Sequence, residues 1–370
     1  MLILDILYYV FIIVACFQVC YFLFFFSPFA FQKESNPSTK NIPISVIICA
    51  KNEAENLKKF LPTVIAQNYP NFEIVLINDA SYDDTLDVME AFAENHPHIK
   101  IVDVKNNEAF WANKKYALTL GIKSAKNNHL LFTDADCTPV SNNWISQMSA
   151  HFSAEKSIVL GYGGYYKIKN SFLNKIIRFE TLLTAIQYLS FARMGLPYMG
   201  VGRNLAYTKD DFFKASGFMK HMYIRSGDDD LFINEIATAT NTSVCVSRES
   251  FTMSNPKTTF KSWVTQKKRH ITTASHYKIS HQMLLASFYA SQLLFWLSGI
   301  VLLSFLFKWE VVLVFISLRF ISQFVIVSFI SKKLDEQDLL PFFPFLEFFL
   351  VIFQLTIFIS NLISKPKHWK

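Results

Sequence analysis

The residues with the most chemical information in this sequence are Asp134 and Asp136, which follow a short apolar run at residues 130–132. Buried parallel strands have such runs, and ligands of open α/β sheets bind beyond the carboxyl ends of the strands. Two carboxylates at this spacing can hold a hard cation such as Mg²⁺ or Mn²⁺, which takes oxygen ligands and often shares them with substrate phosphates. Asp-x-Asp also occurs in ordinary polar loops, so the pair becomes informative only together with its neighbours.

A second acidic cluster, Asp228, Asp229 and Asp230, precedes an apolar helix that we expect to run to about residue 237. Carboxylates are favoured at a helix N-terminus, and capping alone accounts for one or two of them. Three in a row exceed what capping requires. One carboxylate of this cluster is therefore a candidate general base, the group that takes a proton from an attacking hydroxyl.

The elements that position these aspartates alternate between strand and helix. We expect strands at residues 44–49, 73–77, 99–104 and 130–132, and helices at about 54–67 and 114–125. This alternation predicts an α/β domain with a doubly wound, mainly parallel sheet and a site along its carboxyl edge. Polar side chains then follow three strand ends: Asn52 and Glu53, then Asp79, then Asp134 and Asp136.

Acidic groups at successive strand ends suit a nucleotide diphosphate that is held through a metal ion. The first strand is followed neither by a Gly-x-x-x-x-Gly-Lys phosphate loop nor by Gly-x-Gly-x-x-Gly, which disfavours kinase-like NTPases and dinucleotide dehydrogenases. Asn52 and Glu53 have a second interpretation as helix-capping residues, and Lys114 as a solvated group at a helix start.

The chain of 370 residues is 51% hydrophobic, with 38 Phe and a mean hydropathy of +0.24, and the apolar excess lies at its two ends. Residues 1–31 are long enough to span a bilayer and lack the basic start and small-residue cleavage site of a signal peptide, so we expect an uncleaved anchor. Three apolar runs follow at about 283–307, 311–330 and 342–363, which predict two to three transmembrane helices within 283–370. Residues 32–260 form the predicted catalytic-size domain, and residues 261–282 a basic interfacial segment.

The net charge of +7 comes from Lys and Arg beside the apolar runs, which favours a membrane flank over nucleic acid. The positive-inside rule then places the central domain in the cytoplasm, with the chain crossing the cytoplasmic membrane several times. A full span at 342–363 would place Lys365, Lys367 and Lys370 outside, against that rule, whereas a re-entrant last segment would not. The five cysteines show no disulfide or metal-binding spacing, which fits a reducing compartment.

Four motifs in order resemble those of the family 2 glycosyltransferases: SVIICAKNE at 45–53, INDAS at 77–81, KKYAL at 114–118 and TDAD at 133–136. The resemblance covers roughly residues 44–270 and departs from the family at Cys49, where Pro is frequent. It implies a GT-A fold, a nucleotide-sugar donor and inversion at the anomeric carbon. It also implies that Asp79 contacts the nucleotide base and Asp134 the ribose side, with Asp136 binding Mg²⁺ or Mn²⁺. Lys114 would add positive charge near the diphosphate, and Asn52 and Glu53 would contact the donor.

The same resemblance extends to the second half of the site. The segment at 200–207 is similar to family segments on the acceptor side, which implies roles for Gly202 and Asn204. The family places its base two residues before an acidic residue that is followed by Leu. Here that pair is Asp230 and Leu231, so the base would be Asp228. Gly227 stands where the family usually has Glu, and an alignment shifted by one residue would make Asp229 the base instead. QKKRH at 266–270 resembles the Gln-x-x-Arg-Trp motif of cellulose and hyaluronan synthases, with His270 in place of Trp. It implies that Gln266 and Arg269 meet a diphosphate or acceptor, while a basic interfacial flank remains the other interpretation.

The sequence thus predicts a membrane-bound inverting glycosyltransferase. Its expected donor is a sugar linked to uridine diphosphate, and its expected acceptor is lipid-linked or a saccharide. Two alternatives stay open at this point. One is a processive polysaccharide synthase, and the other is an inactive transferase-like scaffold subunit. The donor sugar, the acceptor and the oligomeric state have no signal in the sequence.

Overall fold

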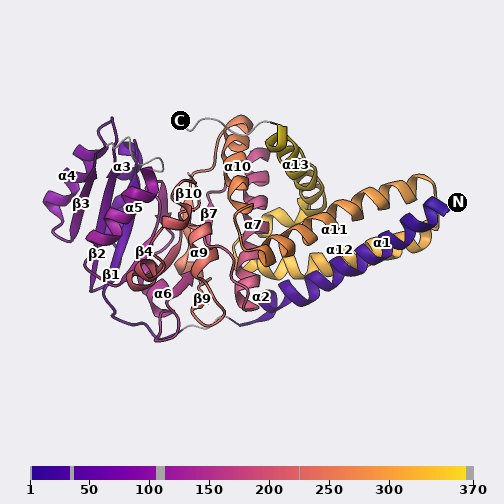
Figure 1. Cartoon of the computed structure of the whole chain (residues 1–370), viewed down its shortest axis with the longest axis horizontal. Coiled ribbons are helices and arrows are strands. Elements are labelled where there is room, and N and C mark those ends of the chain that lie inside the picture. The colour runs from indigo at the N-terminus through magenta and orange to yellow at the C-terminus, as the bar shows by residue number, and fades with distance from the viewer. Residues whose placement is uncertain (1, 34–36, 106–112, 225, 364–370) are drawn as a thin grey trace. The chain divides into compact units, whose positions relative to one another are not determined.

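The computed structural model describes residues 2–33, 37–105, 113–224 and 226–363 (Figure 1). The chain divides into two compact units. The sheet unit consists of Lys33–Asn170 and Gly195–Lys257, and the helical unit consists of Met1–Gln32, Ser171–Met194 and Thr258–Lys370.

The part of the sheet unit that the structure describes contains ten strands: β1 (Ile44–Ala50), β2 (Phe72–Asp79), β3 (Ile99–Val104), β4 (His129–Phe132), β5 (Cys137–Pro139), β6 (Ile158–Leu160), β7 (Gly163–Tyr165), β8 (Leu205–Thr208), β9 (Thr242–Val244) and β10 (Thr252–Ser254). Seven of them form one sheet in the order β3-β2-β1-β4-β8-β6-β9, and the other three form a small sheet in the order β5-β10-β7. β3, β2, β1 and β4 are parallel, β8 is antiparallel to β4 and β6, and β6 is parallel to β9. The predicted mainly parallel, doubly wound sheet is therefore confirmed.

The helices of the sheet unit are α3 (Ala54–Ile65), α4 (Thr85–Asn95), α5 (Asn113–Ser124), α6 (Trp144–Ala150), α8 (Lys209–Lys214) and α9 (Asp230–Ile236), with 3₁₀ turns η2 (Met219–His221) and η3 (Arg248–Ser250). α3 buries Leu57, Leu61 and Val64, at the spacing of one helix face. α5 lies very close to β2, because a Cβ on Gly121 would be 2.1 Å from Ile77 Cδ1. This close approach fixes the position of α5, whose first turn carries Lys114.

The helical unit contains α1 (Leu2–Tyr21), a π-helical turn η1 (Phe22–Phe26), α2 (Ser27–Phe31), α7 (Phe172–Arg193), α10 (Phe260–Ala274), α11 (Ile279–Ser304), α12 (Trp309–Lys333), a 3₁₀ segment η4 (Gln337–Phe342) and α13 (Phe343–Ile363). Within the described residues, four stretches are long and apolar enough to cross a bilayer: Leu2–Phe31, Ile279–Ser304, Trp309–Lys333 and Gln337–Asn361. These are the four apolar runs expected from the sequence.

Two boundaries differ from the predicted ones. α7 lies inside the predicted domain 32–260, but it groups with the apolar helices in the helical unit. α11 begins at Ile279, within the predicted interfacial segment 261–282, since its first turn is polar and gives no hydropathy signal. The tail with Lys365, Lys367 and Lys370 lies outside the described residues.

α1, α11 and α12 lie side by side and form the apolar bundle (Figure 1). The rings of Phe11 in α1 and Phe295 in α11 stack with their centroids 5.4 Å apart. α1 and α12 run in the same direction, because Asp5 pairs with Lys308 at 3.4 Å near their first residues. At the other end, Lys333 Nζ donates to the carbonyl oxygen of Phe29 at 2.9 Å.

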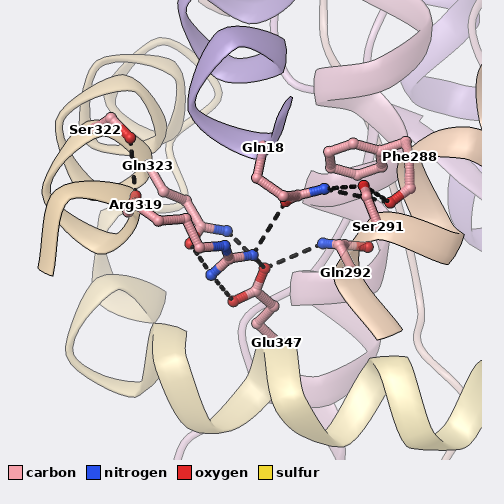
Figure 2. A network of polar contacts seen from close by, with 8 residues as sticks. All are labelled: Gln18, Phe288, Ser291, Gln292, Arg319, Ser322, Gln323 and Glu347. Carbon is pink, nitrogen blue, oxygen red and sulfur yellow. Dashed lines mark hydrogen bonds and ion pairs between the residues drawn. The ribbon is translucent and has the colours of Figure 1, made fainter. Parts of the chain in front are cut away.

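A buried polar network joins this bundle to α13 (Figure 2). Arg319 of α12 and Glu347 of α13 form a bidentate ion pair, with Nη–Oε distances of 2.9 and 2.5 Å, and both side chains are at most 1% exposed. Three glutamines complete it: Gln323 and Gln292 donate to Glu347 at 2.7 and 3.0 Å, and Gln18 accepts from Arg319 at 3.3 Å. The network therefore links all four apolar stretches.

We predict that Glu347→Leu lowers the stability of the detergent-solubilised protein, because it leaves the Arg319 charge buried without a partner. Breaking a buried pair on one side costs about 3–5 kcal/mol, whereas replacing both partners by apolar residues is often neutral. The thermal unfolding midpoint should thus fall in Glu347→Leu and recover in the Arg319→Leu/Glu347→Leu double variant. Equal losses in both variants would contradict an electrostatic role of the pair.

Candidate active site

The sheet topology brings the predicted strand-end residues to one edge. β1 lies between β2 and β4, all three are parallel, and they end at Ala50, Asp79 and Phe132. A pocket opens beside the ends of β1 and β4 and is completed by the loop before β8 and by the two residues that precede α9. Five predicted site residues line it: Lys114, Asp134, Gly202, Asp228 and Asp229.

Lys114 is the central cation of this pocket. Its Nζ lies 2.7 Å from Asp228 Oδ2 and 3.6 Å from Asp134 Oδ1, so it joins the two acidic clusters. Burial alone would lower the pKa of Lys114, but the charges of Asp228 and Asp134 raise it well above its usual value. Lys114 is therefore paired with two carboxylates, although its side chain is 38% exposed to solvent.

Asp228 and Asp229 are adjacent in sequence but have different surroundings. Burial would raise the pKa of Asp228, yet the Lys114 ammonium lowers it below the usual value. Asp229 accepts hydrogen bonds from the backbone N–H groups of Gly202 and Asp230, at 2.7 and 2.8 Å. Burial and the charges of Asp228 and Asp230 raise the pKa of Asp229 to about 7. Asp229 caps α9 and ties it to the Gly202 loop, while the side chain of Asp228 faces the pocket cation.

Asp134, Asp136 and Cys137 offer ligand atoms that all lie within 4.8 Å of one another. Burial and the charge of Asp134 raise the pKa of Asp136, and the positive charges of Arg203 and Lys257 oppose this rise only in part. Burial also raises the pKa of Cys137 well above its usual value, so this residue stays a thiol. The donor set is thus two carboxylates beside a neutral thiol, which fits an oxygen-preferring cation such as Mg²⁺ or Mn²⁺ better than a thiolate-bound metal.

Asn52 and Glu53 both follow β1, and their backbone atoms are held by the loop after β2. Asn52 adopts a positive φ of 57°, and its Oδ1 accepts from the N–H of Tyr82 at 3.0 Å. Glu53 occupies the N-cap position of α3 without a side-chain cap bond. Burial raises the pKa of its carboxyl, and the charges of Asp136 and Asp134 raise it further. Asn52 therefore braces a loop, whereas Glu53 belongs electrostatically to the metal-type cluster.

Asp79 is buried at the end of β2, 3.9 Å from Lys51 Nζ. Burial raises its pKa, and Lys51 and Lys114 oppose this change. Asp79 lies outside the set of residues that line the pocket. Its role as a donor contact stays a prediction.

Asn204, predicted to contact an acceptor, is fully buried. Its Oδ1 accepts from Trp144 Nε1 at 3.0 Å, and its Nδ2 donates to the carbonyl oxygens of Tyr162 and Ser250 at 2.9 and 2.7 Å. These bonds occupy both amide hydrogens and the amide oxygen, so Asn204 holds the core behind the pocket and has no exposed polar atom for a ligand. The predicted acceptor contact is therefore not supported. Gly202, two residues earlier, does line the pocket.

Gln266 and Arg269 lie in α10, which belongs to the helical unit, whereas the carboxylates lie in the sheet unit. Their contact with a diphosphate or acceptor stays a prediction. Their neighbours Lys267 and Lys268 have partners within the helical unit, Glu180 and Ser360. Trp263 of the same helix is buried and stacks on Phe353 with ring centroids 4.4 Å apart, so it packs α10 onto α13.

Sequence reasoning missed three polar residues of the pocket region. The positive charge of Arg203 lowers the pKa of Asp136, and its guanidinium lies 4.4 Å over the Tyr165 ring. Thr133 lines the pocket with a buried Oγ1 that has no hydrogen-bond partner among the described residues. Lys115 is buried and donates to the carbonyl oxygens of His221 and Ile224. Each is adjacent in sequence to a residue that was selected, which was the only available signal.

Residues 45–215 match the family model described as glycosyl transferase family 2. A poly-beta-1,6-N-acetyl-D-glucosamine synthase of Staphylococcus epidermidis is 37% identical over 93 residues, which are 25% of this chain and 21% of that protein. The Escherichia coli protein WfaP, a UDP-Glc:alpha-D-GlcNAc-diphosphoundecaprenol beta-1,3-glucosyltransferase, is 28% identical over 123 residues, 33% of this chain and 46% of that one. The chain therefore spans less than half of the length of these relatives.

Among solved structures, the mannosyltransferase PcManGT of Pyrobaculum calidifontis, in complex with GDP-Man and Mn²⁺, has a similar fold. The TM-score is 0.59 at 14% sequence identity, over 90% of this chain and 98% of that one. At this identity the likeness concerns the fold.

We predict that Asp136→Asn and Asp134→Asn each weaken Mn²⁺ binding by tenfold or more, because each removes half of the carboxylate charge of the cluster. The free Mn²⁺ signal in electron paramagnetic resonance measures this directly, without turnover. Asp87→Asn, an exposed change on α4, serves as the matched control. Unchanged Mn²⁺ binding in both site variants would exclude the cluster as the metal site.

We predict that Asn204→Ala destabilises the fold, because it removes the bonds of the Asn204 amide to the buried Trp144 indole N–H and to the carbonyl oxygens of Tyr162 and Ser250. Each unsatisfied group costs about 1–3 kcal/mol. The thermal unfolding midpoint should fall clearly below that of Asn95→Ala, which removes an exposed amide at the end of α4. A stable Asn204→Ala protein with impaired acceptor use would restore the original prediction.

Proposed function

The domain that contains residues 45–215 belongs to glycosyl transferase family 2, and we propose that the chain is a membrane-bound inverting glycosyltransferase. The reaction moves a sugar from a nucleotide donor to a lipid-linked or saccharide acceptor. The observation that carries this proposal is one pocket in which Lys114 pairs with both Asp134 and Asp228. Lys114 thus contacts one of the proposed metal-binding carboxylates, Asp134, and the proposed base, Asp228.

Asp134 and Asp136 are the proposed holders of Mg²⁺ or Mn²⁺. The ion would neutralise negative charge on the departing nucleoside diphosphate. The similar fold of PcManGT holds GDP-Man with Mn²⁺, and the name of WfaP includes a UDP-sugar donor, which together support a nucleotide sugar here. A uridine diphosphate donor is our proposal, with Asp79 as the contact to the nucleotide base.

Asp228 is the proposed general base. The acceptor hydroxyl oxygen forms a bond to the anomeric carbon, its proton passes to an Asp228 carboxylate oxygen, and the bond to the diphosphate oxygen breaks with its electron pair. Attack from the face opposite to the leaving group inverts the anomeric centre. Lys114 holds Asp228 ionised before reaction, because the ammonium lies 2.7 Å from its carboxylate.

Asp229 has a supporting role in this proposal. Its carboxylate accepts two backbone N–H groups, which fix the Gly202 loop against α9. It remains the alternative base, because a pKa of about 7 is well suited to proton transfer near neutral pH.

The two assignments predict different pH dependences. A base works only when deprotonated, so activity is lost as the pH falls through its pKa. With Asp228, whose pKa is lowered, the rate should stay level from pH 8 down to about pH 5; with Asp229 it should fall below about pH 7. We expect the level profile.

The matched variants sharpen this test. Asp228→Asn should reduce turnover by about 10²–10⁴-fold, the usual contribution of a general base. Asp229→Asn keeps a side chain that still accepts one backbone N–H, and we expect it to lose about tenfold or less. The reverse order of the two losses would transfer the role of base to Asp229.

The acceptor is proposed to be lipid-linked or a growing glycan at the cytoplasmic face of the membrane. One relative is a poly-N-acetylglucosamine synthase, which favours a processive polysaccharide synthase as a second candidate. Incubation of a labelled nucleotide sugar with membranes that contain the full chain distinguishes the two. A single labelled lipid or saccharide supports one addition, a ladder of products supports the synthase, and no transfer to any membrane component would contradict both.

A further inference from the structure

The last apolar helix, α13, is one of four stretches that are long and apolar enough to cross a bilayer. Composition alone does not decide whether it crosses. The contacts within the helical unit do, because they fix on which side of the bundle each end of this segment lies.

The bundle of α1, α11 and α12 has two distinguishable ends. The first end carries Asp5 and Lys308, which pair at 3.4 Å. The second end carries Lys333, whose Nζ donates to the carbonyl oxygens of Phe29 and Gln32. α11 finishes at Ser304, just before α12 begins at Trp309, so α11 starts at the second end.

The segment that leads into α13 starts at this second end, since it follows Lys333 directly. Glu336 and Asp338 there form ion pairs with Arg178 of α7. α7 is in turn paired with α10 through Glu180 and Lys267. These charged contacts place α7 and α10 beside the second end, and α10 also precedes the start of α11 in the chain.

The far end of α13 returns to the same helices. Lys268 Nζ of α10 donates to Ser360 Oγ at 2.7 Å, near the last residue of α13, and Trp263 stacks on Phe353 at 4.4 Å. Near its first residue, the ring of Phe343 meets Phe179 of α7, with ring centroids 5.3 Å apart. α13 therefore has α7 or α10 beside it near both of its ends.

Between these ends, α13 contacts the bundle through Glu347, its fifth residue. Glu347 pairs with Arg319, which lies about 15 Å along α12 from Trp309 and about 21 Å from Lys333 at a rise of about 1.5 Å per residue. Because the hydrocarbon core is about 30 Å thick, this pair lies near its middle. Arg319 is the single charged residue of α12 between Glu310 and Lys332, and Glu347 is the single charged residue of α13. Their ion pair therefore neutralises both charges.

We infer that α13 is a re-entrant helix. The segment after Lys333 enters the bilayer, Glu347 binds Arg319 at mid-depth, and α13 leaves on the side from which it came. The chain then crosses three times, with α1, α11 and α12. The outer face of α13, with Phe345, Ile352 and Phe358 exposed, contacts lipid.

This topology also removes a charge conflict. If α13 crossed the bilayer, its last residues would lie on the opposite side from the second end. Lys267 and Lys268 of α10 would then have to lie on that side too, or the contact of Lys268 with Ser360 would break. It would also place the lysines of residues 364–370 opposite Lys332 and Lys333, against the preference of Lys and Arg for the cytoplasmic side.

The test compares two positions in the full-length chain in spheroplasts of a bacterial host. One variant carries a protease-cleavable epitope between Phe307 and Lys308, and the other carries it after Lys370. We expect opposite sides: protease added outside removes only the first epitope, and the second only after permeabilisation. Both epitopes on the same side would mean four crossings and would overturn the inference. The comparison needs no transferase activity, so it stands apart from the proposed function.

A second readout covers the case in which an inserted epitope prevents folding. Leu306→Cys, and separately a cysteine appended after Lys370, are labelled with a membrane-impermeant maleimide, against the background of the unmodified chain. Labelling of only one position in intact spheroplasts supports the re-entrant helix. Labelling of both, or of neither until permeabilisation, contradicts it.

Discussion

The candidate active-site pocket depends on one cation, Lys114, among several carboxylates. Asp134 and Asp228 come from segments almost a hundred residues apart, and two such carboxylates would repel each other without Lys114 between them. The position of Lys114 depends in turn on α5, which can lie so close to β2 only because residue 121 is glycine. A change in this packing would therefore alter the charge balance of the whole pocket, and with it the protonation of the proposed base.

The helical unit solves a similar problem in an apolar setting. Arg319 and Glu347 satisfy each other, and glutamines from three helices take up further hydrogen-bonding positions (Figure 2). In a bilayer such groups have no water as an alternative partner, so the network specifies which helices meet and in what register. Charge compensation thus has a different effect in each unit. In the pocket, Lys114 lowers the pKa of Asp228, and in the bundle, Arg319 fixes the position of α13 through Glu347.

Much of the fold could be predicted from the sequence, because local patterns determine it. The predicted apolar runs end within two residues of the ends of β1, β2 and β4, and polar residues follow each of these strands. The site was less predictable, because a side chain's role depends on partners distant in sequence. Asn204 lies in a motif that resembles an acceptor segment, yet Trp144, Tyr162 and Ser250 occupy its amide. The place of α7 depends likewise on Arg178 meeting Glu336 and Asp338, a pairing that no local pattern contains.

The central claim is that the Asp134–Asp136 pair and Lys114 form a donor site for a nucleotide sugar. The most direct measurement is nucleotide release by the purified protein across a panel of nucleotide sugars with Mn²⁺ or Mg²⁺, with Asp136→Ala alongside. Our account predicts slow, metal-dependent release from one donor that disappears in Asp136→Ala, while that variant keeps the unfolding midpoint of the parent. Release that continues unchanged in Asp136→Ala, or a panel in which no donor binds or reacts, would contradict it.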